Sequence, residues 1–169
     1  MNWGEIVFWV LSAGAIVSAL LMVTRKSAVS SALSLVMTFC FLAGLYLTLQ
    51  AQFLAIVQVA VYAGAIMVLV LFVIMLLNLK EERLTLGTDR KALIGTLGVI
   101  AIFAQIAAII FANSNGLPPA ISAKAAELGT VESVGMSLYS SFAFPFEMAS
   151  VILIVSAVGA IVLAKKKLR

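Results

Sequence analysis

The sequence predicts an all-α integral membrane protein with five transmembrane helices. Of the 169 residues, 64% are hydrophobic and only 11% are charged, which is typical of a chain embedded in a bilayer. The apolar residues form five stretches, each as long as the roughly 20 residues that cross the hydrocarbon core. Little sequence remains for loops, so we expect a single membrane domain over residues 1–169. The predicted spans are residues 3–23, 28–49, 53–79, 92–112 and 145–164.

The positions of lysine and arginine predict how these helices are oriented. Arg25 and Lys26 follow the first span, a second basic group lies within residues 80–91, and a third follows the last span. With five spans these groups share one side of the membrane, and only Lys124 lies on the other. By the positive-inside rule the amino terminus is outside and the carboxyl terminus is in the cytoplasm or its equivalent. The net charge of +4 therefore reports topology and does not predict binding to nucleic acid.

The first two predicted helices show neither a cleaved signal peptide nor a pair of cysteines that could form a disulfide. Residues 3–23 lack the basic start of a signal peptide, and their only early charge is the acidic Glu5, so we expect a retained helix. Cys40 lies within residues 28–49 and has no second cysteine to pair with, which favours a small core residue. Only residues 50–52 separate the second and third spans, and this short connection predicts a tight antiparallel hairpin.

The third span, residues 53–79, is uncharged but keeps polar and flexible residues near its middle. Gln58 and Tyr62 are four residues apart and so share one face of an α-helix. Gly64 costs about 1 kcal/mol relative to alanine in a helix interior. Polar groups at this depth usually face protein or water. Two interpretations stay open: hydrogen bonding and close packing between helices, or the edge of a water-filled path beside a helix that can change its hydrogen bonds.

The long connection, residues 113–144, is predicted to lie outside. Thr130 followed by Glu132 is typical of a helix start, so we expect a short helix there, on the membrane surface or on a neighbour. In the last span, Pro145 suits the first helical position and Glu147 suits the first turn, near the positive end of the helix dipole. The alternative role for Glu147 is a hydrogen bond to a partner subunit.

The residue types that are missing limit the chemistry of the chain. The sequence has no histidine and one cysteine, which excludes haem ligation by imidazole and an iron–sulfur cluster and makes a zinc site implausible. No phosphate-binding loop or dinucleotide fingerprint occurs. Proton pathways usually place ionisable residues within the bilayer, and the acids that touch a span lie at its ends. We therefore predict no catalytic, cofactor or metal site in this chain, and a proton path nearby has to use partners or water.

Two strings resemble a known family. The string from Tyr62 to Ile66, Tyr-Ala-Gly-Ala-Ile, is similar to the third helix of subunit J of bacterial NADH–quinone oxidoreductase, respiratory complex I. The string from Phe146 to Ser150, Phe-Glu-Met-Ala-Ser, resembles the last helix of the same family. The five-span pattern and the long outside connection also agree, so the resemblance covers nearly the whole chain.

The resemblance implies a core membrane-arm subunit in the bacterial inner membrane. Such a subunit packs with the A, H, K and N subunits, lies in the lipid bilayer and carries no cofactor. The NAD, FMN, iron–sulfur clusters and quinone of the complex are bound by other subunits. On this basis the chain is part of a proton-translocating NADH:quinone oxidoreductase, with no catalytic chemistry of its own.

The resemblance also implies a mechanism for the third helix. The family has a π-bulge near the Tyr-Ala-Gly string, thought to open or close a water path as the enzyme cycles. The matching string in this chain places the bulge around residues 62–67. Some relatives have glutamate where this chain has Gln58, which cannot ionise. The chain would then couple quinone reduction to proton translocation through a conformational gate. The implied gate and proton-path residues are Gln58, Tyr62, Gly64, Ala65 and Met67.

Two other functions fit the composition. A small ion transporter or antiporter would need a charge within the membrane, which this chain lacks, so it would have to work in an oligomer with other proteins. A purely structural membrane subunit would only pack helices. Ion flux from the reconstituted lone chain would favour the transporter, and variants that assemble fully but do not pump protons would exclude the structural role.

Overall fold

The regular structure of this chain is helical throughout the residues that the computed structural model describes, 3–77, 90–113 and 127–165. This confirms the predicted all-α class. The third predicted span begins as the short helix α3, continues as the π-helix η1 and ends as α4. The bounds are α1 (Trp3–Thr24), α2 (Ala28–Thr48), α3 (Gln52–Val57), η1 (Gln58–Ile66), α4 (Met67–Leu77), α5 (Arg90–Asn113), α7 (Val131–Tyr139) and α8 (Ala143–Ala164).

Four of these helical segments are long and apolar enough to cross a membrane. They are α1, α2, the continuous rod Gln52–Leu77 and α8, which match the first, second, third and fifth predicted spans. Helix α5 covers the fourth predicted span, and its described apolar part is the shorter stretch Leu97–Ala112. The predicted end of the third span, residues 78–79, lies outside the described residues.

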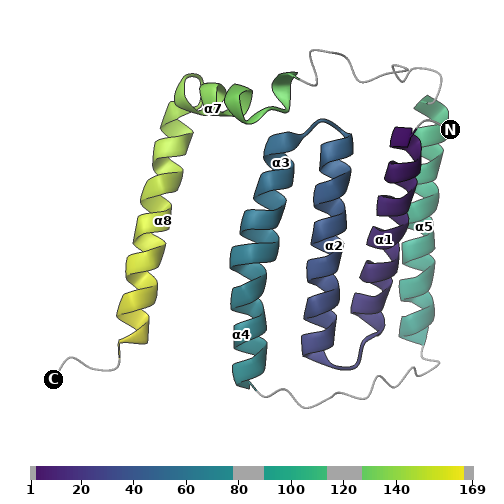
Figure 1. Ribbon diagram of the computed structural model, residues 1–169. Helices are drawn as coiled ribbons and strands as arrows, with labels where there is room; N and C mark the ends of the chain where they lie inside the picture. The colour runs from purple at the N-terminus through teal and green to yellow at the C-terminus, as the bar shows by residue number, and fades with distance from the viewer. Residues whose placement is uncertain (1–2, 78–89, 114–126, 166–169) are drawn as a thin grey trace.

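Helices α1, α2 and the rod Gln52–Leu77 stand side by side as one layer (Figure 1). Helix α2 is at the centre, with α1 on one side and α3, η1 and α4 on the other. The predicted tight hairpin joins α2 to α3. Gln50 turns the chain with a left-handed φ of 61°, and the Ala51 N–H donates to the Tyr46 carbonyl at 2.9 Å.

Small residues bring α1 and α2 together. A side-chain carbon built on Gly14 would lie 2.6 Å from the Phe41 ring, so the ring occupies the space that glycine leaves. The Thr38 hydroxyl donates to Ser18 Oγ at 3.0 Å, and Ser18 Oγ donates to the Gly14 carbonyl at 2.8 Å. Ser18 is buried, and its hydrogen bonds satisfy a hydroxyl that would otherwise be isolated in apolar surroundings.

Helix α7 lies across the end of the molecule where α1 begins (Figure 1). As predicted, Thr130 is its N-cap, and the Ser133 N–H donates to Thr130 Oγ1 at 3.2 Å. Just before it, Gly129 lies so close to the Gln50 carbonyl that no larger residue would fit. The Gly129 carbonyl accepts a hydrogen bond from the Phe53 N–H at 3.2 Å. These contacts attach the end of the long connection to the α2–α3 turn.

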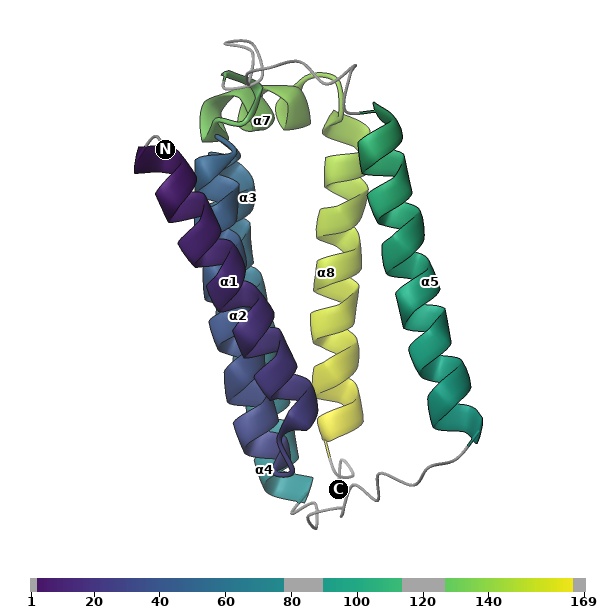
Figure 2. The ribbon, with the colours of Figure 1, turned by 90° about the vertical axis from the view of Figure 1, so that its right-hand side faces the viewer.

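Helices α5 and α8 stand apart from the three-helix layer (Figure 2). Among the described residues, α5 contacts no other helix, and α8 contacts only α7. No residue of α8 is buried, although the helix is almost entirely apolar. An apolar helix without neighbours is stable in lipid, and it also presents a surface to helices of other chains.

Candidate functional site

The rod Gln52–Leu77 changes its hydrogen-bond pattern at its centre. The nine residues Gln58–Ile66 form a π-helix, in which each bond reaches five residues instead of four. At its end, the Met67 N–H donates to the Tyr62 carbonyl, five residues earlier. The resemblance places a bulge around residues 62–67, whereas the π-helix begins at Gln58. The segment is therefore longer than that expectation and includes the polar residue at its start.

The residues at the two ends of η1 explain where it lies. Gln58 is 7% exposed and Met67 is 3% exposed, and α2 is the only helix outside the rod that contacts η1 in the described structure. Nine positions make about two and a half turns of an α-helix, which would put these two residues on opposite faces. A π-helix takes roughly four and a half residues per turn, so nine positions make about two turns. The π-helix thus keeps both Gln58 and Met67 buried.

The amide of Gln58 is available to a partner or to water. Its side chain makes no hydrogen bond to another described residue. However, no fully enclosed side-chain polar atom in the described structure lacks a partner, so the amide atoms must reach the surface of the chain. A largely buried amide without a bond is costly. A hydrogen bond from the Gln58 amide to water or to another subunit would therefore be stabilising.

Tyr62 contacts α2 through its ring. The Tyr62 and Phe39 ring centroids are 5.8 Å apart in an edge-to-face arrangement with an interplanar angle of 65°. Tyr62 is 46% exposed, and its hydroxyl bonds to no described residue. Although Gln58 and Tyr62 are four positions apart, no hydrogen bond joins them. The phenol is free to meet water or a neighbouring subunit.

Gly64 suits the π-helix for a steric reason. A methyl group built on Gly64 would lie 3.2 Å from the Val59 carbonyl oxygen, closer than side-chain carbons ordinarily approach. Glycine avoids this contact because it has no Cβ. Ala65, the next residue, is exposed. Small residues at both positions leave room for the backbone to rearrange.

A shallow hollow, the α2–α4 groove, lies beyond Met67. Its volume is about 260 Å³. The Ser31 hydroxyl in it donates to the Met22 carbonyl at 2.5 Å, so the one hydroxyl of the groove is already engaged. Met67 forms the wall nearest to η1. The groove is lined by Met22, Ala28, Ser31, Ala32, Leu35, Met67, Val70 and Ile74.

Glu147 lies away from η1, on the exposed surface of α8. The predicted helix start at Pro145 is wrong, because α8 begins at Ala143 and has no acidic residue in its first turn. A proline two positions further along is tolerated, since the first-turn N–H groups have no partner within the helix. Glu147 is thus beyond the turn where the helix dipole acts most strongly.

Comparison with known proteins decides the family. The family model described as "NADH-ubiquinone/plastoquinone oxidoreductase chain 6" matches residues 18–163. The chain belongs to this family.

Several relatives within the family are similar over most of this chain. The NAD(P)H-quinone oxidoreductase chain 6 of Leptolyngbya boryana is 38% identical over 161 residues, covering 95% of this chain and 79% of the relative. NADH-quinone oxidoreductase subunit J of Rickettsia bellii is 31% identical over 165 residues, covering 96% and 80%. The F(420)H(2) dehydrogenase subunit J of Methanosarcina mazei is 34% identical over 162 residues, covering 94% and 89%.

These matches confirm the resemblance to subunit J of NADH–quinone oxidoreductase. The chain is a multi-pass membrane subunit of an enzyme complex of this kind, and its partners are other subunits of the complex. The electron donors in the relatives' names differ, so what the relatives share is the membrane subunit.

Phe39 is a residue of the site that was not predicted from the sequence. It provides the ring against which Tyr62 lies. The sequence contains the signal, because the hairpin turns at residues 50–51 and Phe39 and Tyr62 are each about eleven positions from that turn. In an antiparallel hairpin, residues at equal distance from the turn lie at equal depth.

Proposed function

We propose that η1 is a conformational gate through which this subunit couples quinone reduction to proton translocation. The observation that carries the proposal is the nine-residue π-helix in the middle of an apolar span, with the buried Gln58 at its start and the buried Met67 directly after it. π-Helical turns are rare and occur frequently at functional sites. An α-helical form of the same residues supplies the second arrangement that a switch requires.

Conversion of η1 to an α-helix would turn the two halves of the rod relative to each other. The difference over nine positions is about half a turn, so Gln58 and Met67 would no longer both face α2. Moving Met67 would open the α2–α4 groove toward η1. Moving Gln58 would carry its amide to a different neighbour. Either movement changes where water can enter beside the helix.

The protons themselves travel on other groups. The rod Gln52–Leu77 has no charged side chain, and proton pathways use ionisable residues within the bilayer. We place those residues on neighbouring subunits, of the A, H, K and N types that the resemblance implies. NAD, FMN, iron–sulfur clusters and quinone are bound elsewhere in the complex. The present chain controls the path and does not form it alone.

We also propose a membrane topology for the chain. Helix α5 is the fourth of five spans, with the amino terminus periplasmic and the carboxyl terminus cytoplasmic in a bacterial inner membrane. The basic residues after α1 and after α8 then share the cytoplasmic side, as the positive-inside rule requires. Exposed Glu147 is available to a neighbouring subunit near the opposite surface.

Replacing Gly64 with alanine tests the gate. The methyl group of alanine would press on the Val59 carbonyl in the π-helix, which disfavours that form relative to an α-helix. The substitution should therefore shift η1 toward the α-helical form. We expect Gly64→Ala to assemble normally but to translocate fewer protons per quinone reduced, measured in sealed membrane vesicles.

The matched control is Gly135→Ala in α7, a helix that does not contact η1 in the described structure. A side-chain carbon on Gly135 would meet nothing within 4 Å, so the same chemical change should leave proton translocation unaltered. Wild-type proton translocation by Gly64→Ala in a fully assembled complex would contradict the gate.

A further inference from the structure

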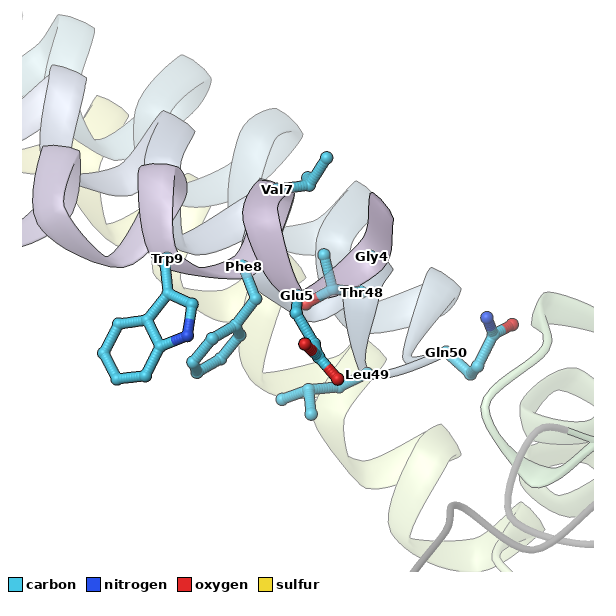
Figure 3. Close-up of a pocket in the computed structure, with 8 residues that line it drawn as sticks. All are labelled: Gly4, Glu5, Val7, Phe8, Trp9, Thr48, Leu49 and Gln50. Atoms are coloured by element: carbon cyan, nitrogen blue, oxygen red, sulfur yellow. The ribbon is translucent and has the colours of Figure 1, made fainter. Parts of the chain in front are cut away.

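A second hollow lies at the end of the molecule where α1 begins and α2 ends. Its volume is about 440 Å³. Figure 3 shows the side chains of Glu5, Phe8 and Trp9 extending to the same side of α1, with the Glu5 carboxylate close to Leu49. Their spacing of three and four residues puts them on one helix face. This hollow, the α1–α2 end site, is lined by Gly4, Glu5, Val7, Phe8, Trp9, Thr48, Leu49 and Gln50.

The lining of the end site favours a cation. It contains one carboxylate and no lysine or arginine. The Thr48 hydroxyl donates to the Leu45 carbonyl at 2.7 Å, so its oxygen can act toward a ligand only as an acceptor. The negative end of the α2 dipole is also here. Glu5 already interacts within the chain, but a carboxylate has two oxygens and accepts several hydrogen bonds.

Two aromatic rings in the lining also favour a cationic ligand. The Phe8 and Trp9 ring centroids are 5.8 Å apart with an interplanar angle of 76°. Trp9 is 65% exposed, so the face of its indole is open to a ligand. Ring faces attract ammonium groups, and tryptophan does so best. A carboxylate beside two rings is therefore suited to an alkylammonium group.

The surface of α1 next to the site indicates that the cation belongs to a lipid. Trp9, Ala13, Ile16 and Leu20 follow one another at helical spacing, and all four are exposed, so they form an apolar stripe that runs from the site along the helix. Trp9 lies about 9 Å along the axis from Trp3, within the first third of α1. An acyl chain fits the stripe while the head group remains at the site.

We propose that the α1–α2 end site binds an aminophospholipid. The primary ammonium of the head group, as in phosphatidylethanolamine, binds the Glu5 carboxylate and the neighbouring aromatic rings, of which Trp9 offers the more exposed face. One acyl chain follows the stripe from Trp9 to Leu20. The site is separate from η1, and its role does not depend on the gate.

Native mass spectrometry of the assembled complex in a mild detergent tests this proposal. The complex is titrated with phosphatidylethanolamine and, in a parallel arm, with phosphatidylglycerol, which lacks the amine. We expect Glu5→Gln to weaken one phosphatidylethanolamine site roughly two- to fivefold, the effect of one exposed ion pair, and to leave phosphatidylglycerol unchanged. The charge-matched control is Glu132→Gln on exposed α7, which should retain the lipid.

A second set of variants tests the ring independently of Glu5. Trp9→Leu removes the aromatic face and should lose the same lipid, whereas Trp9→Phe keeps a face and should retain it. The control is Trp3→Leu, because Trp3 is exposed but does not line the site. Unchanged phosphatidylethanolamine retention in both Glu5→Gln and Trp9→Leu would overturn the proposal. Loss of a neighbouring subunit without loss of lipid would also overturn it, since a basic side chain of that subunit would then be the occupant.

Discussion

At the residue scale, η1 combines one largely buried amide, one half-exposed phenol and one glycine. Gln58 supplies the amide, Tyr62 meets Phe39 across the helix interface, and Gly64 leaves space beside the Val59 carbonyl. In the proposed gate, these residues allow two backbone arrangements and can bind water.

Tyr62→Phe separates the hydroxyl from the ring. The ring contact with Phe39 is kept, so the complex should assemble, while a hydroxyl that bonds to no described residue is removed. If that hydroxyl holds water beside η1, proton translocation falls severalfold at an unchanged rate of quinone reduction without a proton gradient. The measurement compares proton uptake with quinone reduction in the same vesicles.

The control for this change is Phe39→Leu. It removes the ring partner of Tyr62 but leaves the hydroxyl, and we expect weaker packing with a smaller effect on proton translocation. Equal translocation by Tyr62→Phe and the wild type would assign Tyr62 to packing alone.

At the element scale, close contact between α1 and α2 holds the layer against which η1 lies. Phe41 fills the space beside Gly14, and the Thr38–Ser18 hydrogen bond crosses the same interface. Because α2 contacts both α1 and the whole rod Gln52–Leu77, we expect that loosening the contact between α1 and α2 also loosens the contact between α2 and η1. In the proposed gate, the hairpin and the α1–α2 pair are the fixed frame.

Gly14→Ala tests this frame. The added carbon would overlap the Phe41 ring, and forcing extra volume into a packed contact costs about 1–3 kcal/mol. We expect a lower yield of assembled complex and a lower temperature of dissociation, measured by native gel electrophoresis after heating. Gly135→Ala in α7, where a side-chain carbon meets nothing within 4 Å, should assemble like the wild type.

The helices were largely predictable from the sequence. The resemblance also placed a π-bulge in the third span, around residues 62–67, but it did not predict the full extent of the π-helix Gln58–Ile66. Hydropathy and length locate α1, α2, the rod and α8 because each must cover its backbone in lipid. The start of η1 at Gln58 depends on which residues α2 buries, and this is a property of packing. The start of α8 at Ala143 depends on the tolerance of a first-turn proline, which the Pro145 signal obscured.

At the scale of the whole molecule, the long described helices fall into a packed layer and two helices with large exposed surfaces. The layer of α1, α2 and the rod has internal contacts, whereas α5 and α8 have almost none in the described residues. Sequence composition predicted membrane helices but not this separation, since an apolar helix surface looks the same whether it meets lipid or protein. The partners proposed for the complex are expected to lie beside α5 and α8.

The proposed topology is tested by labelling single cysteines in intact cells. Cys40 is first replaced by alanine, and a cysteine is then placed at Ser140, next to α8, or at Ser27, next to α2. A membrane-impermeant maleimide should label Ser140→Cys and should reach Ser27→Cys only after the cells are opened. The reverse pattern would place the amino terminus in the cytoplasm.

The central claim is that Gln58–Ile66 switches between two helical forms. The most direct test is a pair of high-resolution structures of the assembled complex, one at rest and one trapped during turnover. We expect a π-helix with Gln58 and Met67 against α2 in one state, and an α-helix with Met67 turned away from α2 in the other. The same π-helix with both residues buried in every state would contradict the gate.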